Sequence, residues 1–245
     1  TLVLGSSSLL IEHDIAGMFW RCGSCGSDPW EAYEAAHDGK KVKFLCPVPG
    51  YDRHFAITEY FGRLFDRAAY LGIKYLVFGS SQARRIVDDE PMSVPEARAQ
   101  IVDFLKSLVV PFAEKYGIVI AIEPLRPQEC NVINTVADGV EIARAVDSPY
   151  VRVLADVVHM YTQGESLESL ASLGEWLVHA HTSNPAPDPA LGKKRIYPTA
   201  ADEFDQRSFI EPLKRAGVEQ CSIEANVIDF KTDAKNAYEV LKELR

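Results

Sequence analysis

The strongest strand signal in this chain is the run I-V-I-A-I-E, residues 118–123, in which five apolar residues are followed by a carboxylate. An unbroken apolar run of this length is typical of a strand buried on both faces, as in a parallel sheet. Pro124 follows Glu123 and ends the run. A bare charge is costly to bury. We therefore expect the strand to end at an open edge of the sheet, where a positive partner lies near Glu123.

Similar apolar runs recur along the chain with amphipathic stretches between them, and this alternation is typical of parallel βα units. The predicted strands are 42–47, 75–80, 118–123, 151–156, 177–182 and 220–224, with a weaker one at 1–5. The predicted helices are 54–71, 93–116, 134–146, 167–176, 208–216 and 232–244.

Several helix boundaries carry their own signals. Ser93 precedes Pro95 and Glu96, the arrangement of an N-terminal cap with a capping box. Gly117 and Gly217 follow predicted helices and are placed as C-terminal stops.

The alternation predicts an α/β protein with the architecture of a (β/α)8 TIM barrel. An open doubly wound sheet would show a G-x-G-x-x-G turn after its first strand, and this chain has none. A length of 245 residues without a Pro/Gly/Ser-rich linker favours a single barrel domain over residues 1–245. Because the chain begins with Thr and residues 6–39 show no clear periodicity, we expect an incomplete or irregular N-terminal βα unit.

Composition narrows the functional class. The formal net charge of -9 argues against a nucleic-acid binder, since phosphate contacts need clustered Lys and Arg.

The sequence has neither an apolar span of about 20 residues nor a leader peptide, so we expect a cytoplasmic protein with no membrane partner. Cys22 and Cys25 form a C-x-x-C, but no second pair completes a zinc site, which favours a plain loop.

Four of the later predicted strands end on residues that can bind a metal: Glu123, Asp156, His181 and Glu224. In a barrel, the carboxyl ends of the strands meet at one face. Three carboxylates at one place would repel one another unless a cation held them. Oxygen donors with one imidazole suit Mn²⁺, Mg²⁺ or Co²⁺ better than a thiolate-binding ion, and Zn²⁺ is a weaker candidate. A single acid at a strand end could instead cap a helix or lie at the surface.

Other polar residues lie near the same strand ends. His159 follows Asp156 by three positions, where a loop could direct it at a substrate oxygen, although a lone histidine is more often an ordinary loop residue. His179 shares a strand face with His181 and could support it or be a core residue. Residues 183–198 form a long Pro-rich loop of the kind that often acts as a lid. Its basic residues Lys193, Lys194 and Arg195 form either a solvated run or a ligand contact.

The segments I-E-P-L-R-P-Q-E-C-N-V-I-N-T, L-A-D-V-V-H-M, V-H-A-H-T-S-N, R-I-Y-P and S-I-E-A resemble the xylose isomerase-like TIM barrels, the sugar phosphate isomerases/epimerases. F-G-S-S-Q-A-R, residues 78–84, resembles the strand and turn before them. The resemblance covers roughly residues 42–245 and implies one divalent metal held by Glu123, Asp156, His181 and Glu224. It also implies Glu123 and Glu224 as the acid/base pair, with His159 and Arg195 as substrate contacts. The Pro-rich insertion before Arg195 departs from the family pattern.

The resemblance implies a metal-dependent isomerase or epimerase of a ketose or related α-hydroxy carbonyl sugar, in which the metal, most favourably Mn²⁺, stabilises an enediolate. A dimer or tetramer is typical of such relatives. A lyase or dehydratase acting on a keto-sugar or keto-inositol would use the same site. A non-catalytic sugar-binding barrel would not need the metal ligands, and an endonuclease would need more histidines and a basic surface.

Overall fold

The described part of the chain forms one parallel sheet with helices around it. The computed structural model describes residues 53–86, 92–185 and 195–244. Five strands lie side by side in chain order: β1 (Tyr75–Phe78), β2 (Val119–Ile122), β3 (Val151–Asp156), β4 (Leu177–Thr182) and β5 (Cys221–Ile223). This sequential parallel order confirms the predicted βα alternation. The predicted strands 1–5 and 42–47 and the C-x-x-C at Cys22 lie outside the described residues.

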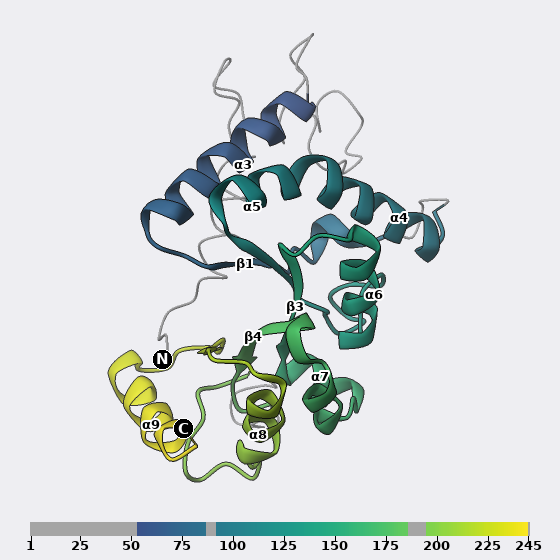
Figure 1. The fold of residues 1–245 in the computed structure, drawn as a ribbon. Helices are drawn as coiled ribbons and strands as arrows, with labels where there is room; N and C mark the ends of the chain where they lie inside the picture. Colours follow the sequence, from purple (N-terminus) through teal and green to yellow (C-terminus); the bar gives the residue numbers. More distant parts are fainter. Residues whose placement is uncertain (1–52, 87–91, 186–194, 245) are drawn as a thin grey trace, which may run out of the picture.

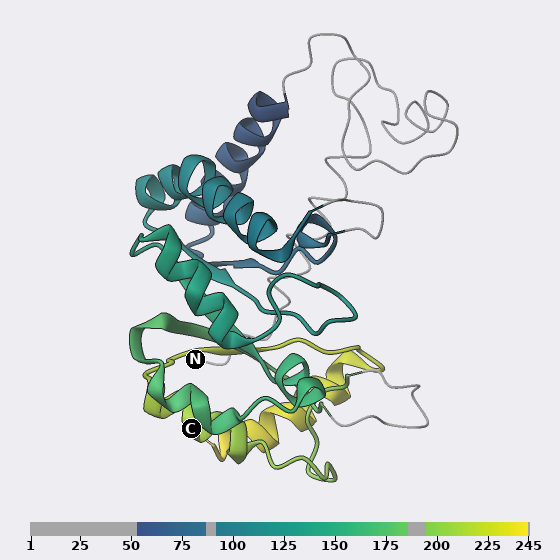
Figure 2. The same cartoon turned by 90° about the vertical axis from the view of Figure 1, so that its right-hand side faces the viewer.

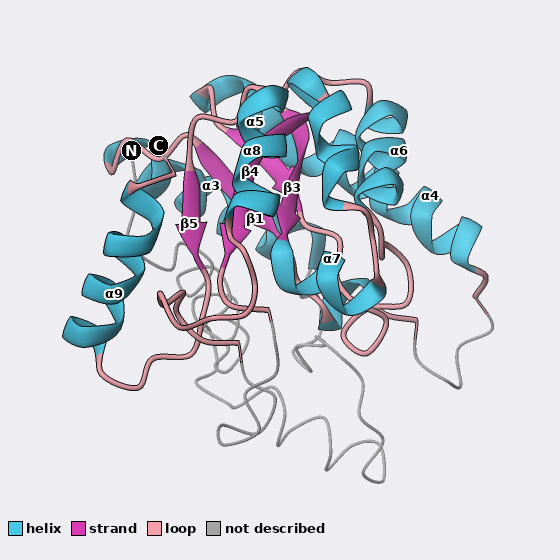
Figure 3. Ribbon diagram, turned by 90° about the horizontal axis from the view of Figure 1, so that it is seen from below, coloured by secondary structure: helices cyan, strands magenta, loops and turns pink. Residues whose placement is uncertain are grey.

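The helices follow the strands and cover the outer side of the sheet (Figures 1 and 3). They are α3 (Arg53–Tyr70), α4 (Val94–Phe104), α5 (Val110–Tyr116), α6 (Val136–Val146), α7 (Val157–Gln163), α8 (Arg207–Ala216) and α9 (Phe230–Lys242). Three short 3₁₀ segments, η1 (Gln82–Arg84), η3 (Leu167–Ser172) and η4 (Gly174–Trp176), and one π-helical turn, η2 (Leu105–Val109), complete the described elements. Turned by 90°, the sheet lies between α3, α4 and α5 at one end and α8 and α9 at the other (Figure 2).

Two predicted helices differ from what is observed. Residues 93–116 are helical, but the π turn η2 separates α4 from α5. Pro111 lies in the first turn of α5 and has no N–H to donate, which explains a break in the regular hydrogen-bond ladder there. The predicted helix 167–176 is the pair η3 and η4, interrupted where Gly174 takes a φ of 51°. The residues around it bury only Leu170, too little apolar surface to anchor a longer helix.

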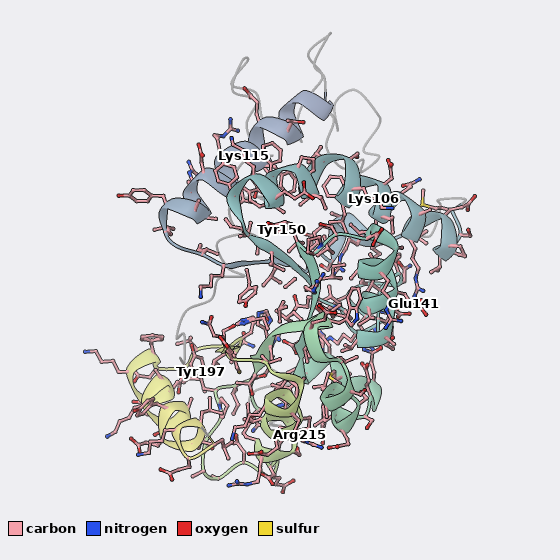
Figure 4. The ribbon with its side chains drawn as sticks, in the orientation of Figure 1. Lys106, Lys115, Glu141, Tyr150, Tyr197 and Arg215 are labelled. Carbon is pink, nitrogen blue, oxygen red and sulfur yellow. The ribbon has the colours of Figure 1, made fainter. Side chains whose placement is uncertain are left out.

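The strands bury alternate side chains in two separate clusters. Ile120 and Ile122 pack in the large cluster between sheet and helices, and Ala121 lies in a small cluster with Val77 and Leu154. Successive side chains of a strand point to opposite faces, so the small cluster marks the inner face of the curved sheet. Figure 4 shows charged side chains on the outward surfaces of the helices, such as Lys115 on α5 and Arg215 on α8.

The parallel register brings the carboxyl ends of the strands to one edge. Asp156, the last residue of β3, pairs with His181 of β4, and His181 pairs with Ser222 of β5. The loops that follow these strands therefore gather on one side of the sheet, below the strands in Figure 3. None of the described helices is long and apolar enough to cross a membrane.

The capping box at the start of α6 gives a test of the helix that packs on β3. The Thr135 hydroxyl accepts from the Asp138 N–H at 3.1 Å, and the Asp138 carboxylate accepts from the Thr135 N–H at 2.9 Å. Thr135→Ala removes the first bond, and we expect it to lower the free energy of unfolding by about 1 kcal/mol. Urea unfolding followed by circular dichroism measures this. Thr135→Ser keeps the hydroxyl and should unfold like the unaltered protein; equal losses in both variants would contradict the capping role.

Candidate metal centre

Four side chains from four neighbouring strands converge at the carboxyl edge of the sheet. Each of Glu123, Asp156, His181 and Glu224 offers one ligand atom, and these atoms all lie within 4.8 Å of one another. Glu123 and Glu224 directly follow β2 and β5, while Asp156 and His181 lie within β3 and β4. The predicted convergence of the four strand ends is therefore observed in the structure.

His181 lies at the centre of this cluster. Its Nδ1 is 2.9 Å from Glu123 Oε1, 2.7 Å from Glu224 Oε2 and 3.6 Å from Asp156 Oδ2. Burial alone would lower the pKa of His181, but the charge of Glu123 and the carboxylate oxygens close to Nδ1 raise this pKa well above its usual value. The cluster thus favours a positive charge at its centre.

Asp156 uses its two oxygens for different purposes. Oδ1 accepts hydrogen bonds from the backbone N–H groups of Val158 at 2.7 Å and His159 at 3.1 Å, and so caps α7. Oδ2 faces the cluster and accepts from Arg195 Nη1 at 2.7 Å. Burial works to raise the pKa of Asp156, but the Arg195 guanidinium and the bond with His181 hold it well below its usual range. Asp156 is therefore both a helix cap and a member of the charged cluster.

Arg195 joins the outer side of the cluster. It donates to Asp156 from Nη1 and to Glu224 Oε1 from Nη2 at 3.0 Å, and the two carboxylates raise its pKa against the opposing effect of burial. The backbone holds it in place, since its carbonyl accepts from the Asn226 N–H at 2.9 Å. Tyr197, labelled in Figure 4, packs with the cluster of Ile223 and α9. Lys193 and Lys194 lie outside the described residues.

His159 lies on helix α7, so the expectation of a loop was wrong. The capping of α7 by Asp156 starts the helix directly after β3, and the side chain of His159 is buried. Its Nδ1 accepts from the backbone N–H of Arg126 at 3.3 Å. In the neutral ring this places the proton on Nε2, which makes His159 a hydrogen-bond donor at that atom.

His179 occupies the inner position of the H-A-H pair. Its Nε2 lies 2.8 Å from the Ser222 hydroxyl, and its ring stacks on Tyr75 and meets the ring of His181 edge to face. Burial lowers the pKa of His179 to about 4, so it is neutral near pH 7. His179 thus supports the ring of His181 through this ring contact.

The donor set fits a divalent cation. A ring nitrogen can carry one proton, and in this geometry the hydrogen bond of His181 Nδ1 goes to Glu123. Glu224 Oε2 lies 2.7 Å from the same nitrogen, which it shares with Glu123, and has no hydrogen-bond donor of its own in the described residues. A buried carboxylate oxygen without a donor is costly. A cation shared by the four groups would satisfy this oxygen and the other ligand atoms together, and the mixture of oxygen and imidazole donors suits Mn²⁺, Mg²⁺, Co²⁺ or Zn²⁺.

Two residues beside the cluster were not singled out as site residues from the sequence. Arg84 is buried, stacks its guanidinium over the Phe78 ring at 5.2 Å, and donates from Nη2 to the Glu123 carbonyl at 2.9 Å. Its Nε and Nη1 have no hydrogen-bond partner in the described residues. Gly79 lies against the carboxylate of Glu123. The only signal for either was their place in the segment F-G-S-S-Q-A-R.

Comparison with known proteins identifies relatives with this architecture. The sequence profile of the xylose isomerase-like TIM barrel family matches residues 36–244. An inosose isomerase of Bacillus licheniformis is 32% identical over 168 residues, which are 67% of this chain and 58% of that protein. The chain thus spans little more than half the length of this relative.

Solved structures show the same fold. A D-psicose 3-epimerase crystallised in the presence of D-fructose has a TM-score of 0.63 and 21% identity, with 77% of this chain and 69% of that chain covered. The IOLI protein with a bound zinc atom has a TM-score of 0.59 and 25% identity, with 80% and 70% covered.

The first part of the chain also matches a second family. A profile described as aspartate amino-transferase matches residues 1–65, and an aspartate aminotransferase of Corynebacterium glutamicum is 47% identical over 58 residues, which are 23% of this chain and 12% of that protein. The two profiles overlap at residues 36–65, and residues 1–52 of the second match lie outside the described residues. A single domain over residues 1–245 stays a prediction.

The family match covers all five described strands and the four converging side chains. Together with the parallel order of the strands and the shared fold of the solved relatives, it identifies this chain as a member of the xylose isomerase-like TIM barrel family.

Proposed function

We propose that this protein is a divalent-metal-dependent isomerase or epimerase of a ketose or related α-hydroxy carbonyl sugar. The observation that carries the proposal is the cluster of three carboxylates around His181, whose ligand atoms lie within 4.8 Å of one another. Relatives named inosose isomerase and D-psicose 3-epimerase support this reaction class. When bound, a divalent ion supplies Lewis-acid stabilisation of the oxygen charge that develops as a carbon acid loses its proton.

Glu123, Asp156, His181 and Glu224 would hold the ion, with Mn²⁺ the best match to this donor set. Glu123 and Glu224 are also the proposed acid/base pair. His181 Nδ1 lies close to one carboxylate oxygen of Glu123 and to one of Glu224. The two carboxyl groups, which follow different strands, therefore face the same point. One glutamate removes the proton next to the carbonyl, leaving an enediolate, and the other returns a proton. Return on the opposite face gives the epimer, and return at the neighbouring carbon gives the isomer.

His159 and Arg195 are the proposed substrate contacts. With its Nδ1 accepting from Arg126, His159 offers Nε2–H to a substrate oxygen. The guanidinium of Arg195 lies at the outer side of the cluster, bonded to Asp156 and Glu224, and would orient a substrate hydroxyl there. A donor at His159 could also protonate a leaving group, and this favours a lyase acting on a keto-sugar or keto-inositol as the second candidate.

Metal binding is the first test. We expect the unaltered protein to bind one Mn²⁺ per chain in isothermal titration calorimetry, and His181→Ala to bind it more than about 100-fold more weakly, because the central nitrogen ligand is lost. Glu175 does not belong to the cluster, and its side chain is 80% exposed. Glu175→Gln therefore serves as a control, and its affinity for Mn²⁺ should be unchanged. Equal affinities of the His181→Ala variant and the unaltered protein would remove His181 from the ligand set.

Solvent exchange is the test of the reaction. We expect the Mn²⁺-loaded protein, incubated with a panel of ketoses in D₂O, to incorporate deuterium at the carbon next to the carbonyl, as seen by NMR of the recovered sugar. Glu224→Gln can neither accept nor return this proton and should slow the exchange by about 10²-fold or more. Loss of water or of an aglycone would instead support the lyase. Metal binding without exchange or elimination on any substrate would overturn the catalytic proposal and leave a sugar-binding barrel.

The Arg195 bridge gives a stability prediction. Arg195→Met leaves two carboxylates of the cluster without their cation, and we expect the metal-free variant to lose about 3 kcal/mol of unfolding free energy. Added Mn²⁺ should raise its melting temperature more than it raises that of the unaltered protein, because the ion replaces the missing charge. Arg215→Met breaks an exposed ion pair with Glu168 and should leave the free energy of unfolding nearly unchanged. If Mn²⁺ raises the melting temperature of Arg195→Met no more than that of Arg215→Met, the ion does not replace the missing charge of Arg195.

A further inference from the structure

Gly79, the residue after β1, lies against the carboxylate of Glu123. A Cβ built on Gly79 would be 2.2 Å from Glu123 Oε2 and 3.4 Å from Glu123 Cδ. The two residues are adjacent because β1 pairs with β2 in parallel, with Phe78 opposite Ile122, and the Glu123 N–H donates to the Phe78 carbonyl at 3.2 Å. Any residue other than glycine would place an atom where the carboxylate now lies.

The backbone conformation does not account for this glycine. Five glycines of the described chain, Gly72, Gly117, Gly164, Gly174 and Gly217, have positive φ values that favour glycine, and Gly79 is not one of them. A Cβ at those five positions would meet nothing within 4 Å. At Gly79 the constraint is therefore steric: a side chain is excluded because it has no room, and not because of the backbone dihedral angles.

Glu123 has little freedom to move away. Its side chain is 7% exposed, Oε1 bonds with His181 Nδ1 at 2.9 Å, and its carbonyl accepts from Arg84 at 2.9 Å. Turning the carboxylate away from Gly79 would require its Oε1 to leave His181 or its backbone to leave Arg84. The turn after β1, residues 78–84, therefore holds Glu123 on three sides: Phe78 at its N–H, Gly79 at its carboxylate and Arg84 at its carbonyl.

We propose that Gly79 is a positioning residue for the metal centre, which sets the orientation of the Glu123 carboxylate by leaving room for Oε2. The inference rests on the proposed metal site. It predicts that a single methyl group added at Gly79 weakens metal binding although no ligand residue is replaced. Gly79 acts only through Glu123 and is not itself a ligand or an acid/base group.

The test compares two glycine-to-alanine variants. Gly79→Ala displaces the carboxylate, and we expect Mn²⁺ to bind about 10- to 100-fold more weakly by calorimetry, as for other residues that orient a ligand. Co²⁺ in the same site should show an altered visible absorption spectrum, which a loss of stability alone would not produce. Gly62→Ala is the matched control: its Cβ would meet Phe112 at an ordinary 3.6 Å, so metal affinity and spectrum should stay unchanged.

Shortening the acid provides a rescue. Glu123→Asp draws the carboxylate back by one methylene group, so Gly79→Ala should cost less metal affinity in that background than in the unaltered protein. The same second change should restore folding if Gly79→Ala alone does not fold.

The outcomes separate the two proposals. If the unaltered protein binds no divalent metal, the proposed function and this inference both fail. If it binds Mn²⁺ and Gly79→Ala binds equally well with the same Co²⁺ spectrum, only the role of Gly79 is overturned. Failure of Glu123→Asp to reduce the loss, or to restore folding, also overturns it, because the effect would then not act through the carboxylate.

Discussion

The repulsion among three carboxylates at one edge of the sheet is the constraint on which the rest of the site depends. Asp156 ends β3, Glu123 and Glu224 directly follow β2 and β5, and all three face a common point. In surroundings with little water, like charges at this distance raise the energy of the folded state unless a positive group lies between them. His181 occupies the centre and Arg195 the outer side, and both carry hydrogen bonds to the acids. The arrangement of positive charge thus follows from the arrangement of negative charge.

Much of this was predictable because the two signals involved are local. The alternation of apolar runs and amphipathic stretches gave β3 and β4 with their observed bounds, and parallel strands necessarily present their last residues at one edge. The cluster of Glu123, Asp156, His181 and Glu224 could be predicted for the same reason. Whether those side chains hold a metal is a question of chemistry that the strand pattern alone does not answer.

The parts that were missed depend on contacts between distant segments. Helix α7 was read as a loop because its seven residues are too few for a clear period, while its start is set by the second oxygen of Asp156. Arg84 lies far from Glu123 in the sequence, and only the pairing of β1 with β2 brings its guanidinium to the Glu123 carbonyl. Gly79 carries no side chain to suggest a role. Such residues become visible only when the three-dimensional neighbours are known.

The order of the strands along the chain determines when the four side chains become available during synthesis. Each of the four clustered side chains comes from a different strand, and Glu224 follows β5, the last strand of the described residues. A nascent chain that has emerged only as far as β4 would present two acids and one imidazole without the acid of the last strand. Tight ion uptake would then have to wait until β5 has emerged from the ribosome, so metallation would report on a sheet that is complete through β5 and not on an early folding stage.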